Sequence, residues 1–227
     1  MNRPALHDLV LRAASVDDVR LAVWMLGNDR YAYRLDDGAK TALAVAALAD
    51  GQALAKTARV GSEPAALAAE LGLAVAYDDG EIAVAGQIFC ADYRPKPPRI
   101  RLYTRALAAI DRCLAIPGVA NTLGTALSAP VLLAHEIYHH LDLARPTSLA
   151  QRYPISSLKL GSWHLKTEVP AMAEIAAGRF AASLLGLRCH PKLLDLLLLW
   201  DSDPRRASAW TGALEAFSPA CALKETL

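Results

Sequence analysis

The segment 131–141, VLLAHEIYHHL, contains two histidines four positions apart, with a glutamate directly after the first. Residues four positions apart share one face of an α-helix, so His135 and His139 can offer imidazole nitrogens to one metal ion. Glu136 lies beside them and can reach a water molecule at the metal, but not the metal itself. Two neutral nitrogen ligands, an open coordination position and a carboxylate base are what a hydrolytic zinc site needs. The sequence therefore predicts a zinc site with Glu136 as general base.

A pair of buried histidines, or a zinc site that only stabilises the fold, is the simpler alternative. The neighbours of the motif are uncharged, as a metal-binding helix packed in a core requires: Leu133, Ala134, Ile137, Tyr138 and Leu141. A purely structural zinc site does not require the carboxylate of Glu136. This glutamate favours the catalytic interpretation.

A third protein ligand is needed to leave a single open position on zinc. The downstream candidates are His140, His164, Glu168 and Glu174. His140 points about 100° away from His139 around the helix, so we expect it to pack or to hydrogen-bond nearby. Glu168 is expected to be a carboxylate near the start of a helix, favoured there by the helix dipole. Glu174 lies in a helix rich in alanine and glycine, which can approach the histidine helix closely, and it is the third ligand we predict.

Helices are expected on both sides of a short β-region. An apolar stripe near the N-terminus and good helix formers over 41–55 predict that the first seventy residues or so are helical. Ser62 is the expected N-cap of a short helix over 63–71. Later helices are expected at about 105–115, from Asn121 or Ser128 to about 143, and at 168–186, 191–200 and 204–216, with a polar connection over 144–166.

Three short β-runs, LAVAY, EIAVAGQIF and RIRLY, lie between residues 73 and 103. Asp78-Asp79-Gly80, between the first two runs, is typical of a hairpin turn. Because the strands come in a row and only helices follow, we expect an α+β fold with a small, mostly antiparallel sheet.

Composition excludes several classes of protein. The 227 residues include 24 basic and 23 acidic side chains, a balance that argues against direct binding to nucleic acid. Four well-separated cysteines without a CxxC pair indicate a reducing compartment, and we expect a cytoplasmic protein. The N-terminal residues show no signal-peptide core. The uncharged stretch 113–134 contains prolines and glycines and predicts a loop and a buried helix, not a membrane span.

The residues also resemble a known family. Glu174 begins the pattern E-x-x-A-x-x-F-A, and with HExxH this is similar to the gluzincin metallopeptidases. AELGLAVAYD at 69–78, AGQI at 85–88, PRIRLY at 98–103 and AHEIYHH at 134–140 resemble, in this order, the ImmA/IrrE-type minimal gluzincins. The resemblance covers about residues 64–187. It implies a zincin-like domain over 63–227, with the small sheet packed on the HExxH helix and the glutamate-bearing helix. Residues 1–62 would be an accessory helical region, and more helices would follow at the C-terminal end.

Three departures from the family pattern concern the surroundings of the ligands. Tyr138 stands where the family often has glycine. Gly178 stands where related gluzincins often have an aspartate that supports a histidine. The stretch between Tyr103 and His135 is longer than in the minimal members. None of these departures removes a ligand.

The resemblance implies hydrolysis of a peptide bond by zinc held on His135, His139 and Glu174, with Glu136 as general base. Members of this family commonly cut a repressor, so a regulatory protein such as a transcriptional repressor is the implied substrate. An extended peptide is expected to dock along the strand near 86–93. Tyr93, Tyr153 and His164 are candidate donors to the oxyanion.

Two other interpretations of the whole chain are open. It could be a catalytically inactive, zinc-stabilised binding or sensing module that docks through its alanine-rich N-terminal helices. The interpretation as a regulator that binds DNA directly has less support, because the charge is balanced and the sequence shows no clear helix-turn-helix motif. The sequence leaves the substrate and the oligomeric state unspecified.

Overall fold

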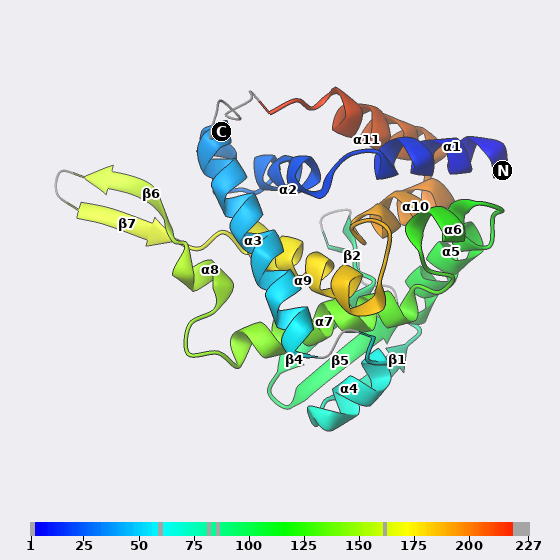
Figure 1. Ribbon diagram of the computed structural model, residues 1–227, viewed down its shortest axis with the longest axis horizontal. Coiled ribbons are helices and arrows are strands. Elements are labelled where there is room, and N and C mark those ends of the chain that lie inside the picture. Colours follow the sequence, from blue (N-terminus) through cyan, green and yellow to red (C-terminus); the bar gives the residue numbers. More distant parts are fainter. Residues whose placement is uncertain (1–2, 59–60, 81–82, 85–86, 161–162, 220–227) are drawn as a thin grey trace.

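The computed structural model describes residues 3–58, 61–80, 83–84, 87–160 and 163–219. In these residues, helices predominate, and the strands form one three-stranded sheet and two separate two-stranded ladders (Figure 1). The fold class is α+β, as predicted.

Four helices precede the sheet. They are α1 (Arg3–Ala14), α2 (Asp18–Gly27), α3 (Asp37–Thr57) and α4 (Pro64–Glu70), with a 3-10 turn η1 (Ala32–Arg34) before α3. The carboxylate of Asp36 caps α3 by accepting a hydrogen bond of 2.7 Å from the backbone N–H of Ala39. The predicted N-cap Ser62 was wrong by one position. Glu63 caps α4, because the Ser62 hydroxyl donates instead to the Ala58 carbonyl at the end of α3.

The three-stranded sheet is mixed, not mostly antiparallel as predicted. Its strands are β1 (Ala74–Asp78), β4 (Ala91–Pro95) and β5 (Pro98–Tyr103), in the spatial order β1-β5-β4. β1 runs parallel to the central strand β5, and β4 runs antiparallel to it. The remaining strands, β2 (Ala83–Val84) and β3 (Gln87–Ile88), pair with each other.

The hairpin expected at Asp78-Asp79-Gly80 does not pair the first two β-runs. The Asp78 carboxylate accepts a hydrogen bond of 2.8 Å from the backbone N–H of Gly80, which turns the chain out of the sheet. β1 is left to pair with β5 in the described part of the chain. The middle run, EIAVAGQIF, lies partly outside the described residues.

The C-terminal half is mainly helical. Its elements are α5 (Thr104–Leu114), α6 (Val119–Leu123), α7 (Ala129–Leu143), α8 (Leu149–Arg152), β6 (Ile155–Leu160), β7 (Trp163–Thr167), α9 (Pro170–Leu185), α10 (Leu193–Ser202) and α11 (Pro204–Ala216). The predicted polar loop over 144–166 was wrong, because this segment holds α8 and the projecting β6–β7 hairpin (Figure 1). Ser148 and Gln151 form a capping box that starts α8.

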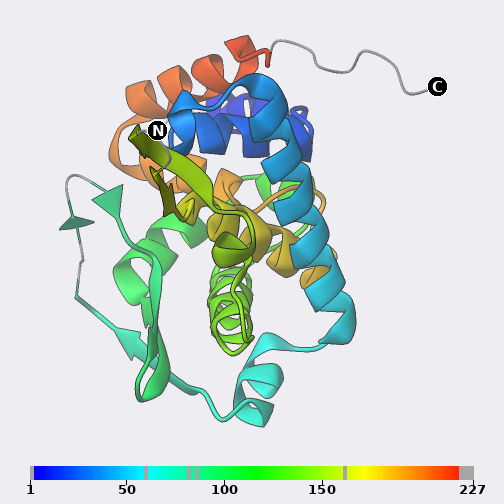
Figure 2. The same ribbon diagram turned by 90° about the vertical axis from the view of Figure 1, so that its left-hand side faces the viewer.

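Helix α7 lies at the centre of the molecule. Figure 2 shows it nearly end-on, between the sheet on one side and α3 on the other. Ile100 and Leu102 of β5 and Val131 and Ile137 of α7 are fully buried in the core. α9 packs on α7, and α3 packs in turn on α9. This arrangement brings the HExxH helix, the Glu174 helix and the sheet together.

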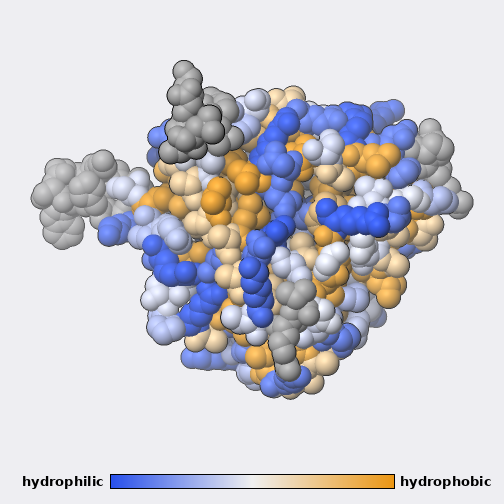
Figure 3. All heavy atoms as spheres, viewed as in Figure 1, coloured by the Kyte–Doolittle hydropathy of each residue, from blue (hydrophilic) through white to orange (hydrophobic). Residues whose placement is uncertain are grey.

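Helices α1 and α2 pack against α11, the last described helix. Trp24 of α2 meets Trp210 of α11 edge to face, with ring centroids 5.2 Å apart, and Arg12 forms an ion pair with Glu215. Among the described residues on the face in Figure 3, apolar groups gather in patches between hydrophilic ones. No helix in the described ranges combines the length and apolar character needed to cross a membrane.

Candidate metal centre

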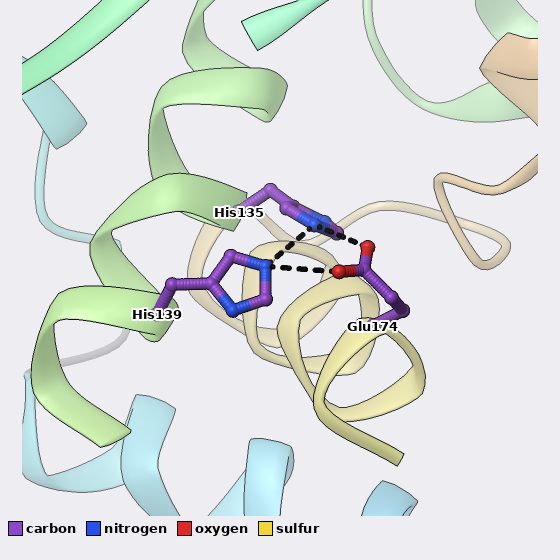
Figure 4. A group of neighbouring side chains, drawn as sticks. All are labelled: His135, His139 and Glu174. Carbon is purple, nitrogen blue, oxygen red and sulfur yellow. Dashed lines mark hydrogen bonds and ion pairs between the residues drawn. The ribbon is translucent and has the colours of Figure 1, made fainter. Parts of the chain in front are cut away.

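His135, His139 and Glu174 converge at one point between two helices (Figure 4). The Nε2 atoms of the two histidines, on consecutive turns of α7, are 3.2 Å apart. The carboxylate oxygens of Glu174, on α9, lie 3.2 Å from Nε2 of His135 and 3.5 Å from Nε2 of His139. One ligand atom from each residue lies within 4.8 Å of the others, so this group could hold a metal ion.

The start of α7 and the composition of α9 explain this approach. Ser128 is the N-cap of α7, and its backbone N–H donates a 2.8 Å hydrogen bond to the Asp111 carboxylate of α5. Of the two predicted starting points, Ser128 was therefore correct, and Asn121 lies in α6. Small residues of α9 are fully buried near Glu174: Ala176, Ala177 and Ala181. α9 packs on α7, and its backbone at Ala176 also comes close to α3.

The protonation states of His139 and Glu174 suit metal binding, whereas His135 is shifted toward its protonated form in the metal-free chain. Burial lowers the pKa of His139, and the charge of His135 adds to this effect while Glu174 opposes it. The resulting pKa is about 4, so the imidazole is neutral near pH 7. Partial removal from water would raise the pKa of Glu174, but hydrogen bonding and charge from His135 hold it at about 2. Burial would lower the pKa of His135, but Glu174 raises it overall. A neutral imidazole and an ionised carboxylate are the forms that bind metals.

Glu136 is buried next to the group, with 8% of its surface exposed. Burial raises the pKa of its carboxyl to about 7, opposed by the charge of His135 and by the backbone N–H of Tyr93 on β4. Glu174 adds a smaller upward effect. A carboxyl group with a pKa near 7 can take up and release a proton near neutral pH, which is what a general base must do.

The other predicted residues are placed differently. His140 is not part of the group, and its Nδ1 lies 2.8 Å from the Tyr93 hydroxyl, which confirms that it hydrogen-bonds nearby. Glu168 is exposed and lies outside the ligand group. Tyr153 follows α8 and is 40% exposed, with no hydrogen bond to the group within the described ranges. The side chain of His164 lies outside the described residues.

Helix α3 supplies contacts to both ligand-bearing helices that the sequence analysis missed. Asp50 accepts a 2.8 Å hydrogen bond from the Tyr138 hydroxyl of α7 and also pairs with Arg145 and Arg152. A Cβ at Gly51 would lie 2.2 Å from the Ala176 carbonyl oxygen of α9, so the two helix backbones touch there. A glycine inside an alanine-rich helix was the available signal.

The space beside Gly178 is filled by a histidine. A Cβ at position 178 would lie 2.2 Å from Cε1 of His190, whose side chain is buried. Nε2 of His190 lies 3.1 Å from the Ile175 carbonyl, and its Nδ1 lies 3.2 Å from the backbone nitrogen of Lys192. His190 therefore ties the α9–α10 connection to the helix of Glu174.

No protein-family model, curated protein or solved structure matches this chain. The site is therefore interpreted from its own residues. Three features are available for this interpretation. The fold is α+β, two histidines and a glutamate form a group that could hold a metal, and a buried glutamate lies beside that group.

Proposed function

We propose that this chain is a zinc-dependent metallopeptidase of the zincin type, similar to the ImmA/IrrE-type gluzincins. The observation that carries the proposal is the meeting of His135, His139 and Glu174 beside the buried carboxyl of Glu136. Two imidazoles and one carboxylate are a ligand set of hydrolytic zinc sites, and they leave a fourth position free.

The donor set fits zinc in chemistry as well as in number. Two imidazole nitrogens and a carboxylate oxygen suit a borderline metal ion, and the ligand atoms are already close together. Zinc in this position would supply a Lewis acid that activates water and polarises a carbonyl group. The protein supplies the orientation of the ligands, because α7 and α9 are packed together.

In this proposal Glu136 moves the proton. Its carboxylate would accept the proton of the attacking water and pass it to the leaving amine. The pKa is about 7 in the metal-free chain, so the protonated form is accessible, and the charge of a bound cation would favour the ionised form that acts first. The backbone N–H of Tyr93 and the charge of His135 favour the ionised form needed for the first step.

The substrate we propose is an extended segment of a protein, with a transcriptional repressor as the regulatory target. β4 is an outer strand of the three-stranded sheet, and it carries Tyr93 next to α7. A peptide adding along such a strand would have its backbone beside Glu136. The protein would then cleave this repressor in the cytoplasm and would not bind nucleic acid directly.

Metal content and peptide cleavage test this proposal together. We expect about one zinc per chain by elemental analysis, strongly reduced in His135→Ala and Glu174→Ala and retained in the control Glu168→Ala. Glu136→Gln is expected to keep zinc and to lose cleavage of a peptide library. Cleavage by Glu136→Gln at the wild-type rate would reject the mechanism. Zinc binding without cleavage in the wild type would favour the inactive sensing module.

A further inference from the structure

Tyr93 of β4 is hydrogen-bonded to the face of α7 that carries Glu136. Its hydroxyl lies 2.8 Å from Nδ1 of His140, and the two rings meet edge to face with centroids 5.5 Å apart. His140 follows Glu136 by four positions, so the two side chains lie on one face of the helix. The two histidines of the ligand group precede them by one position each and meet α9 instead. Helix α7 therefore presents one face to α9 and a neighbouring face to β4.

The backbone of Tyr93 faces the outer edge of the sheet. The backbone N–H of Tyr103 donates a 2.9 Å hydrogen bond to the carbonyl of Cys90, so these two residues form a hydrogen-bonded pair next to the β4–β5 ladder. Hydrogen-bonded and non-hydrogen-bonded pairs alternate in an antiparallel ladder, so the pair of Tyr93 with Ile100 is non-hydrogen-bonded. The N–H and C=O of Tyr93 therefore point away from β5, to the side on which no strand of the described sheet pairs with β4.

Tyr93 therefore joins this edge of the sheet to the candidate general base. Its side chain is bonded to α7, and its backbone N–H favours the ionised form of Glu136. A peptide that adds along β4 would hydrogen-bond to backbone groups of the same outer edge. Because His140 and Glu136 lie on one helix face, the bond to His140 fixes where this edge lies relative to the Glu136 carboxyl.

We propose that Tyr93 and His140 form a positioning pair that sets the distance between the peptide-binding edge of β4 and Glu136. This proposal rests on the proposed function and adds two residues that are not metal ligands. In the described sheet β4 pairs with a strand on one side only, so the bond to His140 limits its movement away from α7. The tolerance is small, since a misplacement of about 1 Å in an active site can cost about a hundredfold in rate.

Amide hydrogen exchange in the metal-free full-length chain tests this pair without an assay of activity. The amides to follow are those of Asp92 and Arg94, which face β5, relative to the amides of α9. We expect Tyr93→Phe and His140→Leu each to speed their exchange about tenfold, because one hydrogen bond is lost. The double variant should exchange no faster than either single variant, since both changes break the same bond.

Two further variants serve as controls. His140→Asn should restore slow exchange, because its side-chain amide can accept or donate a hydrogen bond close to the position of Nδ1. Tyr153→Phe removes a hydroxyl from an exposed tyrosine and should leave the exchange of β4 unchanged.

Zinc content and peptide cleavage then connect the pair to the reaction. Both residues lie outside the ligand group, so Tyr93→Phe and His140→Leu should still bind about one zinc per chain. For a peptide that the wild type cleaves, we expect kcat/KM to fall about tenfold in both variants and to recover in His140→Asn.

The possible failures are distinguishable. Unchanged exchange in Tyr93→Phe and His140→Leu would overturn the proposal that the pair holds β4. Faster exchange with unchanged kcat/KM would overturn its role in positioning Glu136. Absence of cleavage by the zinc-loaded wild type would instead reject the proposed function, and the positioning role would fall with it.

Discussion

The Tyr138 hydroxyl donates a hydrogen bond of 2.8 Å to the Asp50 carboxylate, which joins the residue before His139 to helix α3. Arg145 and Arg152 also donate to this carboxylate. Burial would raise the pKa of Asp50, but the hydrogen bonds from Arg152, Tyr138 and Arg145 lower it overall. Helix α3, which precedes the sheet in the sequence, therefore holds the C-terminal half of α7.

Removing this contact should destabilise the chain. We expect Tyr138→Phe and Asp50→Asn each to lower the free energy of unfolding by about 2 kcal/mol, because a hydrogen bond to a charged group is lost. The double variant should lose less than the sum, since both changes break the same contact. Urea denaturation of the four proteins measures the coupling, and fully additive losses would show that the contact contributes nothing.

The contribution of Asp50 should depend on pH. Because its pKa is lowered in the folded chain, its stabilising effect is complete above the unfolded pKa of about 3.9 and is lost as the pH falls through the folded value. The stability difference between wild type and Asp50→Asn should therefore be constant from pH 5 to 8 and shrink below pH 4. A difference that grows on acidification would contradict this assignment.

The contact of α3 with α9 can be tested at Gly51. Gly51→Ala would place a Cβ 2.2 Å from the Ala176 carbonyl oxygen, so the two helices must separate. We expect a loss of about 1–3 kcal/mol in the free energy of unfolding and weaker zinc binding, because Glu174 lies on the displaced helix. Gly212→Ala is the matched control: nothing lies within 4 Å of its new methyl group, and it should stabilise α11 slightly.

The features that the sequence predicted correctly are those encoded within one helix. His135 and His139 share a face by spacing alone, and the small residues around Glu174 predicted a close helix contact. The capping box of Ser148 and Gln151 was an equally local signal for α8 that the polar composition of its surroundings concealed.

The errors and omissions concern partners that are distant in the chain. The parallel pairing of β1 with β5 joins Val75 to Ile100, and no turn signal encodes such a pairing. The bond between Asp50 and Tyr138 is of the same kind. Local patterns therefore pointed to the three residues that converge, whereas the residues that hold their helices together became visible only in the folded chain.

The His190 ring occupies the space that a side chain at position 178 would need, so substitutions at Gly178 and His190 should have coupled effects on stability. Gly178→Ala would bring a methyl group to 2.2 Å from the His190 ring, and we expect it to lose about 1–3 kcal/mol of stability. His190→Ala should also destabilise, because it leaves a cavity and removes the acceptor of the Lys192 backbone N–H. In the double variant the clash is relieved. Chemical denaturation should therefore show that the double variant loses less free energy of unfolding than the two single variants together. Additive losses would show that the two positions do not interact.

Glu136 should make the metal-free protein less stable as the pH rises. Its pKa is about 7 in the folded chain because burial disfavours the charge, against about 4.3 when exposed. The neutral form is therefore favoured by folding, and this contribution is complete below about pH 4 and lost as the pH rises through 7. Relative to Glu136→Gln, the wild type should lose stability between pH 5 and 8, by roughly 3 kcal/mol in total.

Zinc should suppress this pH dependence. A cation held by His135, His139 and Glu174 would favour the ionised form of the neighbouring Glu136 and lower its pKa. Denaturation curves can be recorded from pH 5 to 8 with and without zinc. Without zinc, the stability of the wild type should fall with pH relative to that of Glu136→Gln, and with zinc this difference should largely disappear. Glu168→Gln, an exposed position, should follow the wild type throughout. If the stability of the metal-free wild type and of metal-free Glu136→Gln changed with pH in the same way, the buried carboxyl would not take up a proton in this range. That result would contradict the proposal that Glu136 both accepts and donates the proton.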